Sequence, residues 1–156
     1  MPVSEILDRI QESRNRFPAE WICLTGGEPL LQNIKPLVLA LKKEKYFIQI
    51  ETNATQFSSL PLDWVTVSPK PKNYICCPEF RNVAREVKLI VTKELNIDII
   101  RSFRKNFPLH IPLLLQPENN QSWSIKKGLR LLWQAIRDGQ SNLRLSFQLH
   151  KLIGVK

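Results

Sequence analysis

Six short apolar runs, alternating with segments of helical period, constrain the fold of this chain more than any other feature of its sequence. Each run has the length of a β-strand and is bounded by proline, asparagine or charged residues. Parallel strands need crossover connections of a dozen or more residues, and helical segments between the runs can supply them. We therefore expect an α/β fold with a mostly parallel sheet covered by helices, with strands at 21–25, 47–50, 64–67, 87–91, 111–115 and 143–147.

The expected helices are identified by apolar residues that recur every three or four positions. They lie at 4–16, at 34–41, around 93–106, and in a last segment that ends at Gly139. With such helices between the strands, we expect both faces of the sheet to be buried. One face of the last helix carries the apolar residues Ile125, Leu129, Leu132, Trp133 and Ile136.

Length, composition and charge favour one domain over residues 1–156, because 43% of the residues are apolar and can form a sizeable core. No apolar run approaches the roughly 18 residues of a membrane-spanning helix, and the amphipathic start is unlike a signal peptide, so a cytoplasmic location is expected. The formal charge of +9 favours anionic ligands. The basic residues are scattered and do not interleave with aromatic ones, which argues against a nucleic-acid partner.

The three cysteines do not form a recognisable metal site. Cys23, Cys76 and Cys77 make neither a CxxC pair nor a CxxxCxxC set, and adjacent cysteines are poorly placed to chelate one metal together. Cys23 lies in an apolar run, where we expect a small buried thiol. Cys76 and Cys77 are expected in a loop, and we predict no metal-ligating residue.

Polar clusters directly follow five of the predicted strands. Because the carboxyl ends of parallel strands share one edge of a sheet and form its ligand crevice, these clusters are expected to converge on one site for a polar, partly anionic ligand. The clusters are Thr25-Gly26-Gly27-Glu28-Pro29, Glu51-Thr52-Asn53, Ser68-Pro69-Lys70, Gln116-Pro117 and residues 148–151.

The Gly26-Gly27 turn has two interpretations. Glycine lets a backbone approach a ligand closely and adopt dihedral angles that other residues resist, and Glu28 offers an acceptor for an ammonium group. In the alternative interpretation, the segment is a turn between a strand and a helix, with Glu28 as the cap and Pro29 as the first helical residue. The turn alone does not decide between them.

The motifs LTGGEPLLQ, IETNATQ, VTVSPK, VKLIV, LLLQP and SFQLHKLIG occur in this order, and together they resemble the C-terminal two-thirds of the 7-carboxy-7-deazaguanine synthase family. The resemblance implies a partial (β/α) barrel of the radical S-adenosylmethionine type, with its first strand missing. It also implies a lyase reaction of queuosine biosynthesis, in which 6-carboxy-5,6,7,8-tetrahydropterin becomes 7-carboxy-7-deazaguanine. The ring contracts and ammonia leaves.

The resemblance also implies roles for individual residues. Glu51 would accept hydrogen bonds from ribose hydroxyls of S-adenosylmethionine, and Lys70 would face the carboxylate of this cofactor. The other residues expected to bind the cofactor are Gly26, Gly27, Glu28, Ser68 and Pro69. The residues expected to bind the pterin substrate are Thr25, Gln116, Gln148 and His150.

The sequence departs from the family in two places. The N-terminal segment with the cysteines of the four-iron four-sulfur cluster and the magnesium ligand is not found, so an incomplete core that is inactive alone is expected. Truncation is the favoured explanation; the alternatives are one subunit of a split enzyme that pairs with a cluster-bearing chain, or a cluster-free module that binds S-adenosylmethionine or a pterin. An exposed sheet edge would favour a partner chain or a homodimer. Ala54 replaces a usual glycine, in a turn where positive φ is expected.

Overall fold

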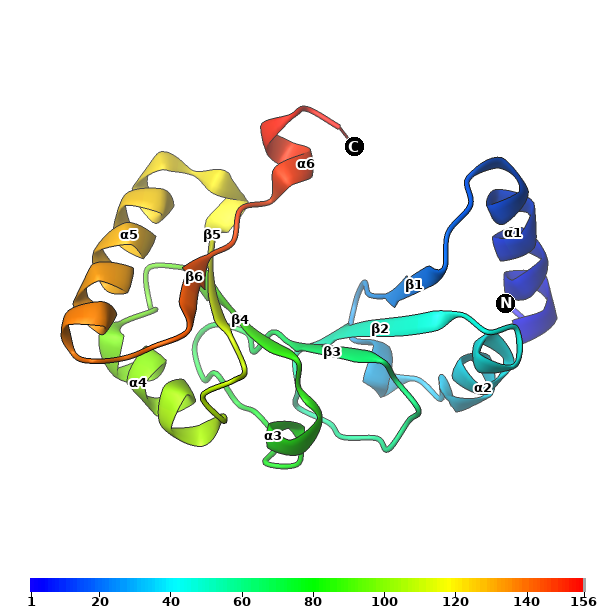
Figure 1. The fold of residues 1–156 in the computed structure, drawn as a ribbon, viewed down its shortest axis with the longest axis horizontal. Coiled ribbons are helices and arrows are strands. Elements are labelled where there is room, and N and C mark those ends of the chain that lie inside the picture. Colours follow the sequence, from blue (N-terminus) through cyan, green and yellow to red (C-terminus); the bar gives the residue numbers. More distant parts are fainter. Residues whose placement is uncertain (156) are drawn as a thin grey trace.

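The computed structural model describes residues 1–155, and its central element is a six-stranded sheet in which every pairing is parallel (Figure 1). All six predicted strands are confirmed, with bounds that shift by a few residues, and so is the α/β class. The spatial order follows the chain: β1 (Trp21–Leu24), β2 (Phe47–Thr52), β3 (Trp64–Val67), β4 (Glu86–Val91), β5 (Leu113–Pro117) and β6 (Leu143–Leu145).

The sheet is curved and does not close into a barrel. Among the described residues, β1 pairs only with β2 and β6 only with β5, which leaves two edges. Trp21 of β1 stacks on Phe47 of β2 with ring centroids 5.1 Å apart, and both rings remain about half exposed. The architecture is therefore that of a partial barrel.

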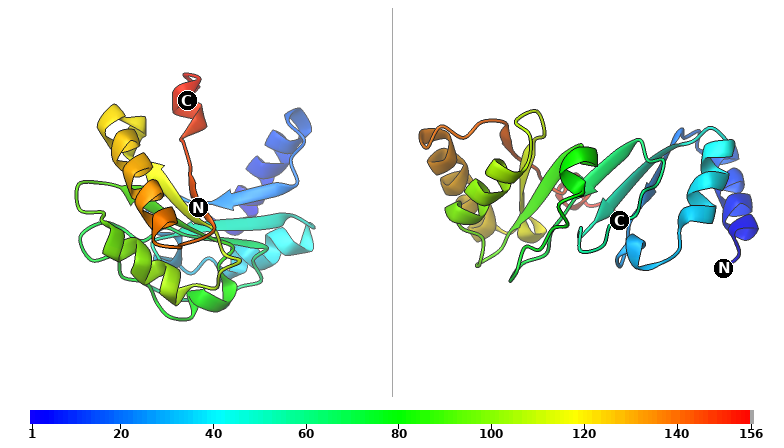
Figure 2. Two further views of the ribbon diagram at one scale, coloured as in Figure 1. Left: turned by 60° about the vertical axis from the view of Figure 1, so that its left-hand side comes forward. Right: turned by 90° about the horizontal axis from the view of Figure 1, so that it is seen from below.

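All helices except the last, at residues 149–152, cover the outer, convex face of the curved sheet, whereas the last helix lies on the open inner side, as Figure 2 shows. The expectation that both faces are buried is therefore wrong for the described residues, and the inner face is open. No helix within residues 1–155 combines the length and apolar character needed to cross a membrane. The helices are α1 (Val3–Arg16), α2 (Lys35–Lys43), α3 (Phe80–Val83), α4 (Ile97–Asn106), α5 (Ser122–Arg137) and α6 (Leu149–Leu152), with short 3-10 turns η1 (Pro29–Leu31) and η2 (Glu118–Asn120).

Strand alternation separates the two faces chemically. Successive side chains of a strand point to opposite faces, so that Ile48, Ile50 and Leu89 are fully buried under the helices. Residues between them, such as Gln49 and Lys88, point to the open face and are partly exposed. The core therefore lies between the sheet and the outer helices, and the inner face is left to polar side chains.

The prediction of a buried Cys23 thiol is wrong. Cys23 pairs in register with Gln49 and therefore lies on the inner face, where it is exposed. Its apolar neighbours Ile22 and Leu24 point to the other face and pack against the core. The apolar run indicated a strand correctly, but it did not indicate which of its residues would face the open side.

Helix α5 packs with a different face from the one that its apolar residues indicated. Its buried residues are Ser124, Gly128, Leu131 and Ala135. A Cβ at Gly128 would lie 3.0 Å from Leu145 Cδ2, so a larger residue there would require the Leu145 side chain to shift. Small side chains thus set the packing face. The bulky Leu129, Trp133 and Ile136 lie at its margin and are at least two-fifths exposed.

Candidate functional site

The carboxyl ends of the strands bring five of the predicted site residues around one cavity. Thr25, Glu51, Gln116, Gln148 and His150 all line a cavity of about 430 Å³ on the inner side of the sheet. They come from β2, β5 and the segments that follow β1 and β6, so only the parallel sheet makes them neighbours. The remaining lining residues are Lys88, Ser146, Phe147 and Leu149.

The Gly26-Gly27 turn lies beside open space. Both residues have positive φ, +84° at Gly26 and +53° at Gly27, which a residue with a Cβ rarely adopts. A Cβ on either residue would meet no heavy atom within 4 Å. The glycines are therefore required by the backbone conformation and not by packing within the chain. The space beside their backbone is free for a ligand.

Glu28 is a buried cap. The residue is 8% exposed, and its Oε1 accepts hydrogen bonds from Leu30 N at 3.1 Å and Thr52 Oγ1 at 2.6 Å. Its Oε2 accepts from Asn53 N at 2.6 Å. Glu28 caps η1, which begins at Pro29, as the alternative interpretation of this turn predicted. Glu28 thereby ties the Gly-Gly turn to the end of β2, and it does not line the cavity.

The predicted cofactor residues after β3 are joined to this same network. Ser68 N donates to Thr52 O at 2.7 Å, and Lys70 Nζ lies 3.4 Å from Ser68 Oγ. Ser68 and Pro69 are buried, whereas Lys70 is exposed. The structure thus separates the predicted residues into two groups. One is the loop network of the Gly-Gly turn, Glu28 and residues 68–70, and the other lines the cavity and includes Glu51.

Ala54 has φ +63° and no exposed surface. The expectation of positive φ in this turn is confirmed. Its backbone is held on both sides, because Ala54 N donates to Thr52 Oγ1 at 3.0 Å and Ala54 O accepts from Cys77 N at 2.8 Å. An alanine can therefore occupy this left-handed position, since the surrounding contacts fix it.

Lys88 is a site residue that the sequence analysis missed. Its Nζ lies 2.8 Å from Glu51 Oε2, and both side chains line the cavity. Cys23 lies near this pair. The pKa of its thiol is raised, mainly because the strand and its neighbours remove part of the water around this otherwise exposed residue; Glu51 raises the pKa further and Lys88 lowers it. The sequence does contain a signal, because Lys88 is a charged residue inside the strand motif VKLIV, at a position whose side chain must leave the core.

Asn120 of η2 positions the C-terminal part of the site through the backbone of Gln148. Asn120 Oδ1 accepts from Gln148 N at 3.2 Å, and Asn120 Nδ2 donates to Gln148 O at 2.9 Å. Asn119 Oδ1 accepts from Lys151 Nζ at 2.5 Å. The Gln148 Oε1 atom is buried and has no hydrogen-bond partner among the described residues. A buried acceptor without a partner at a cavity wall is available to a ligand donor.

Within residues 1–155, no three His, Cys, Asp or Glu side chains gather in a way that could hold a metal ion. Cys23 lies on the inner face, whereas Cys76 and Cys77 lie in the loop before α3 and pack against the core. Burial raises the pKa of the Cys76 thiol to about 11, which keeps it protonated at neutral pH. Cys77 Sγ donates to Thr55 O at 3.2 Å.

Known proteins resemble this chain over almost its entire length. A 7-carboxy-7-deazaguanine synthase from Buchnera aphidicola is 31% identical over 162 residues, covering 100% of this chain and 68% of the relative. The chain belongs to the 7-carboxy-7-deazaguanine synthase family. A synthase of this family from Synechocystis is 28% identical over 155 residues, which cover 99% of this chain and 71% of the relative. No general protein-family model matches the chain.

A solved structure of the 7-carboxy-7-deazaguanine synthase family supports the same assignment. The crystal structure of QueE from Escherichia coli is similar with a TM-score of 0.73 and 27% identity, covering 95% of this chain. This chain spans 64% of the length of that protein. Family membership and the shared α/β fold therefore rest on sequence and structure together.

Proposed function

We propose that this chain forms the S-adenosylmethionine and substrate walls of a 7-carboxy-7-deazaguanine synthase. The proposed reaction converts 6-carboxy-5,6,7,8-tetrahydropterin to 7-carboxy-7-deazaguanine. The observation that carries the proposal is the convergence of Thr25, Glu51, Gln116, Gln148 and His150 on one cavity at the carboxyl end of a parallel sheet. Family membership supports the same reaction.

The cavity residues suit a pterin. Gln116 and Gln148 each offer a donor and an acceptor on one planar amide, which matches the alternating groups at the edge of a pterin ring. Thr25 offers a hydroxyl, and His150 offers a ring nitrogen that can donate or accept. We propose that these four residues hold the substrate. The orphan Oε1 of Gln148 supports this role, because a ring N–H would satisfy it.

The loop network suits the amino-acid end of S-adenosylmethionine. Backbone at Gly26 and Gly27 lies beside open space, and Lys70 places an exposed cation near Ser68 for the cofactor carboxylate. Glu28 would hold the Gly-Gly turn in this conformation, because its carboxylate oxygens are already engaged by the chain. The cofactor supplies the radical chemistry of the family. We assign to this chain only its binding and orientation.

The cluster and magnesium of the family do not fit the described residues. Cluster iron is held by cysteine thiolates, and Cys23 lies apart from Cys76 and Cys77 on a different face of the sheet. We propose that the 156-residue chain binds its two small molecules without turning over the substrate on its own.

Isothermal titration calorimetry tests the proposal on the chain as it stands. The wild type should bind both S-adenosylmethionine and 6-carboxy-5,6,7,8-tetrahydropterin. Lys70→Ala should weaken cofactor binding by roughly tenfold, because a charge-assisted hydrogen bond is lost. Lys72→Ala is the matched control, since it removes the same charge from the same loop two positions away.

The outcomes separate the parts of the proposal. A wild type that binds neither molecule would contradict the proposed function. Equal cofactor affinity in wild type and Lys70→Ala would remove Lys70 from the cofactor site and leave the substrate assignment standing. An equal loss in Lys72→Ala would mean that the overall charge of the loop matters and not the position of Lys70.

A further inference from the structure

Glu51 and Lys88 meet across a strand to which neither belongs. Glu51 lies on β2 and Lys88 on β4, with β3 between them. Adjacent strands lie about 4.8 Å apart, so the two backbones are roughly 10 Å apart. The side chains close this gap with 2.8 Å between Lys88 Nζ and Glu51 Oε2. Thr66 of β3 is paired in register with Glu51 on the inner face, and it nevertheless has no exposed surface.

The buried Thr66 side chain has hydrogen-bond partners other than this ion pair. Its hydroxyl donates to Glu86 Oε1 at 2.8 Å and accepts from Gln49 Nε2 at 3.3 Å. The Thr66 hydroxyl is thus engaged by Gln49 and Glu86. The Glu51–Lys88 pair lies at the cavity wall and, within residues 1–155, forms no hydrogen bond with Thr66.

Both partners keep hydrogen-bonding capacity for a bound molecule. A carboxylate has two acceptor oxygens and an ammonium has three donors. Among residues 1–155, Glu51 uses Oε2 and Lys88 uses one donor, each toward the other. The Glu51 side chain is 29% exposed and that of Lys88 is 16% exposed. Glu51 Oε1 can therefore accept from a ligand while Lys88 holds Oε2.

The pair also balances the charge of the cavity. Glu51 and Lys88 carry opposite charges, and His150 is the only other ionisable residue among the described residues that line the cavity. If Lys88 were neutral, the Glu51 carboxylate would face an incoming anion without compensation. Like charges at close range oppose binding strongly.

We propose that Lys88 is a positioning residue for a reduced pterin that carries a carboxylate. It holds the Glu51 carboxylate across β3, with Oε1 free for N–H groups of the ring. Its charge offsets that of Glu51, so that the substrate carboxylate is accepted in the same cavity. This inference rests on the proposed function, because the ligand is the substrate of the family. It groups Glu51 with the substrate residues and away from the cofactor ribose.

A double-mutant cycle measured by calorimetry tests the inference. The proteins are wild type, Lys88→Met, Glu51→Gln and the double variant. The probes are 6-carboxy-5,6,7,8-tetrahydropterin and 5,6,7,8-tetrahydropterin, which lacks the carboxylate. Lys88→Met should weaken binding of the carboxylated pterin by about tenfold or more, and that of the other pterin less. The double variant should lose less than the product of the two single losses, because removing both charges restores the balance.

Conservative and distant variants complete the test. Lys88→Arg should restore most of the affinity, which a role in packing alone would not predict. Lys93→Met removes a lysine outside the cavity and should bind both pterins like the wild type. Circular dichroism and the urea midpoint of each variant confirm that it is folded.

Two results would overturn the role of Lys88 and leave the proposed function standing. The first applies if the wild type binds the carboxylated pterin: the Lys88→Met variant then binds it equally tightly. The other is a double variant whose loss equals the product of the single losses within about twofold, because Lys88 would then act independently of Glu51. If the wild type binds neither pterin, the proposed function fails, and this inference fails with it.

Discussion

The two faces of the sheet are built from the same strands and have different roles. On the outer face, residues such as Ile50 and Leu89 are fully buried against the helices. On the inner face, their neighbours Glu51 and Lys88 meet at the wall of a cavity. Alternate positions of one strand are therefore divided between stability and recognition. Substitutions on one face should change the free energy of unfolding, and those on the other should change ligand affinity.

The largest expected effect is that of removing a core side chain from the outer face. Leu89→Ala should lower the free energy of unfolding by about 2–5 kcal/mol, because the fully buried leucine leaves a cavity that the sheet and helices cannot fill. Urea unfolding followed by circular dichroism measures this change.

Gln116→Ala is the corresponding variant of the inner face. Gln116 lines the cavity. Replacing it with alanine should lower the free energy of unfolding by less than about 1 kcal/mol and should weaken pterin binding. Equal destabilisation by Leu89→Ala and Gln116→Ala would show that the two faces are not divided in this way.

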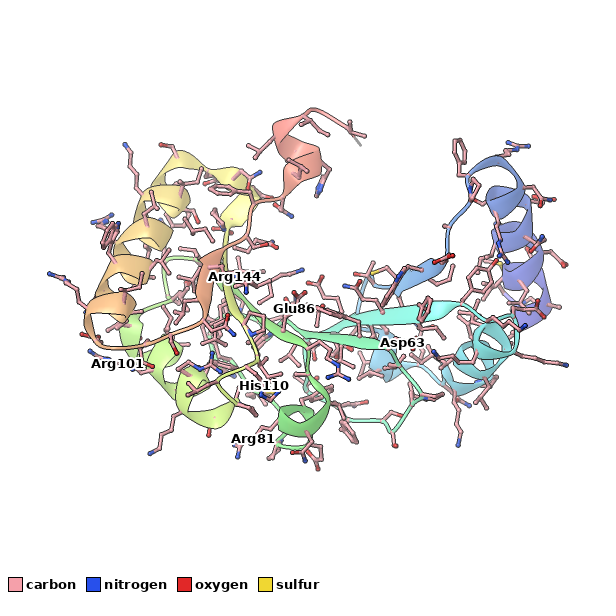
Figure 3. All side chains as sticks on the ribbon, in the orientation of Figure 1. Asp63, Arg81, Glu86, Arg101, His110 and Arg144 are labelled. Atoms are coloured by element: carbon pink, nitrogen blue, oxygen red, sulfur yellow. The ribbon has the colours of Figure 1, made fainter. Side chains whose placement is uncertain are left out.

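A smaller effect is expected for an ion pair of the outer layer. Asp63 lies between the sheet and α2 (Figure 3), where it pairs with Lys42 and accepts from Ile48 N at 2.6 Å. Burial acts to raise the pKa of Asp63, but the bonds from Lys42 and Ile48 outweigh it and the pKa is lowered. The stabilisation is thus present above the unfolded pKa of about 3.9 and is lost as pH falls through the lower folded pKa.

Asp63→Asn should therefore lower the free energy of unfolding by about 1 kcal/mol at pH 7, because a charged acceptor is replaced by a neutral one. The difference from wild type should narrow below about pH 4. Urea unfolding at a series of pH values measures it. A difference that stays constant down to pH 3 would contradict the assigned cause. Pterin binding should not change, which distinguishes this pair from Glu51–Lys88.

The smallest effect on stability is expected for the clamp at Gln148. Asn120→Gly removes both side-chain bonds to the Gln148 backbone, and glycine tolerates the φ of +54° at this position. Pterin affinity should fall several-fold while the urea midpoint changes little. Asn119→Gly is the matched control, because it also has positive φ and contacts Lys151 instead. Equal losses of affinity in both variants would remove the special role of Asn120.

Much of the fold could be predicted from the sequence because buried parallel strands have short, almost continuous apolar sequences. The convergence of Thr25, Gln116 and Gln148 also followed, since residues after parallel strands share one edge of the sheet. The Lys88–Glu51 pair did not follow, because it depends on two side chains that reach over β3. Local sequence does not specify such a contact between strands that are not neighbours.

Other errors have local causes. Counting apolar residues selected Trp133 and Ile136 for the packing face of α5, but Gly128 allows the close approach and small side chains determine that face. Cys23 was assigned to the core because alternation within a run of four apolar residues does not reveal the open side. Helix α6 was not predicted from the sequence. It is four residues long and has no buried residue, so it cannot show the apolar repeat by which longer helices are recognised.

The strand order also bears on how the chain can fold. Every strand pairs with the strand that precedes or follows it in the chain, and none is inserted between two earlier ones. Each new pairing therefore closes only one crossover loop, which keeps the entropic cost of loop closure small at every step. The sheet can grow outward from any one pair of strands, because no strand has to insert between two strands that are already paired. A defect at one edge would then leave the pairing at the other edge intact.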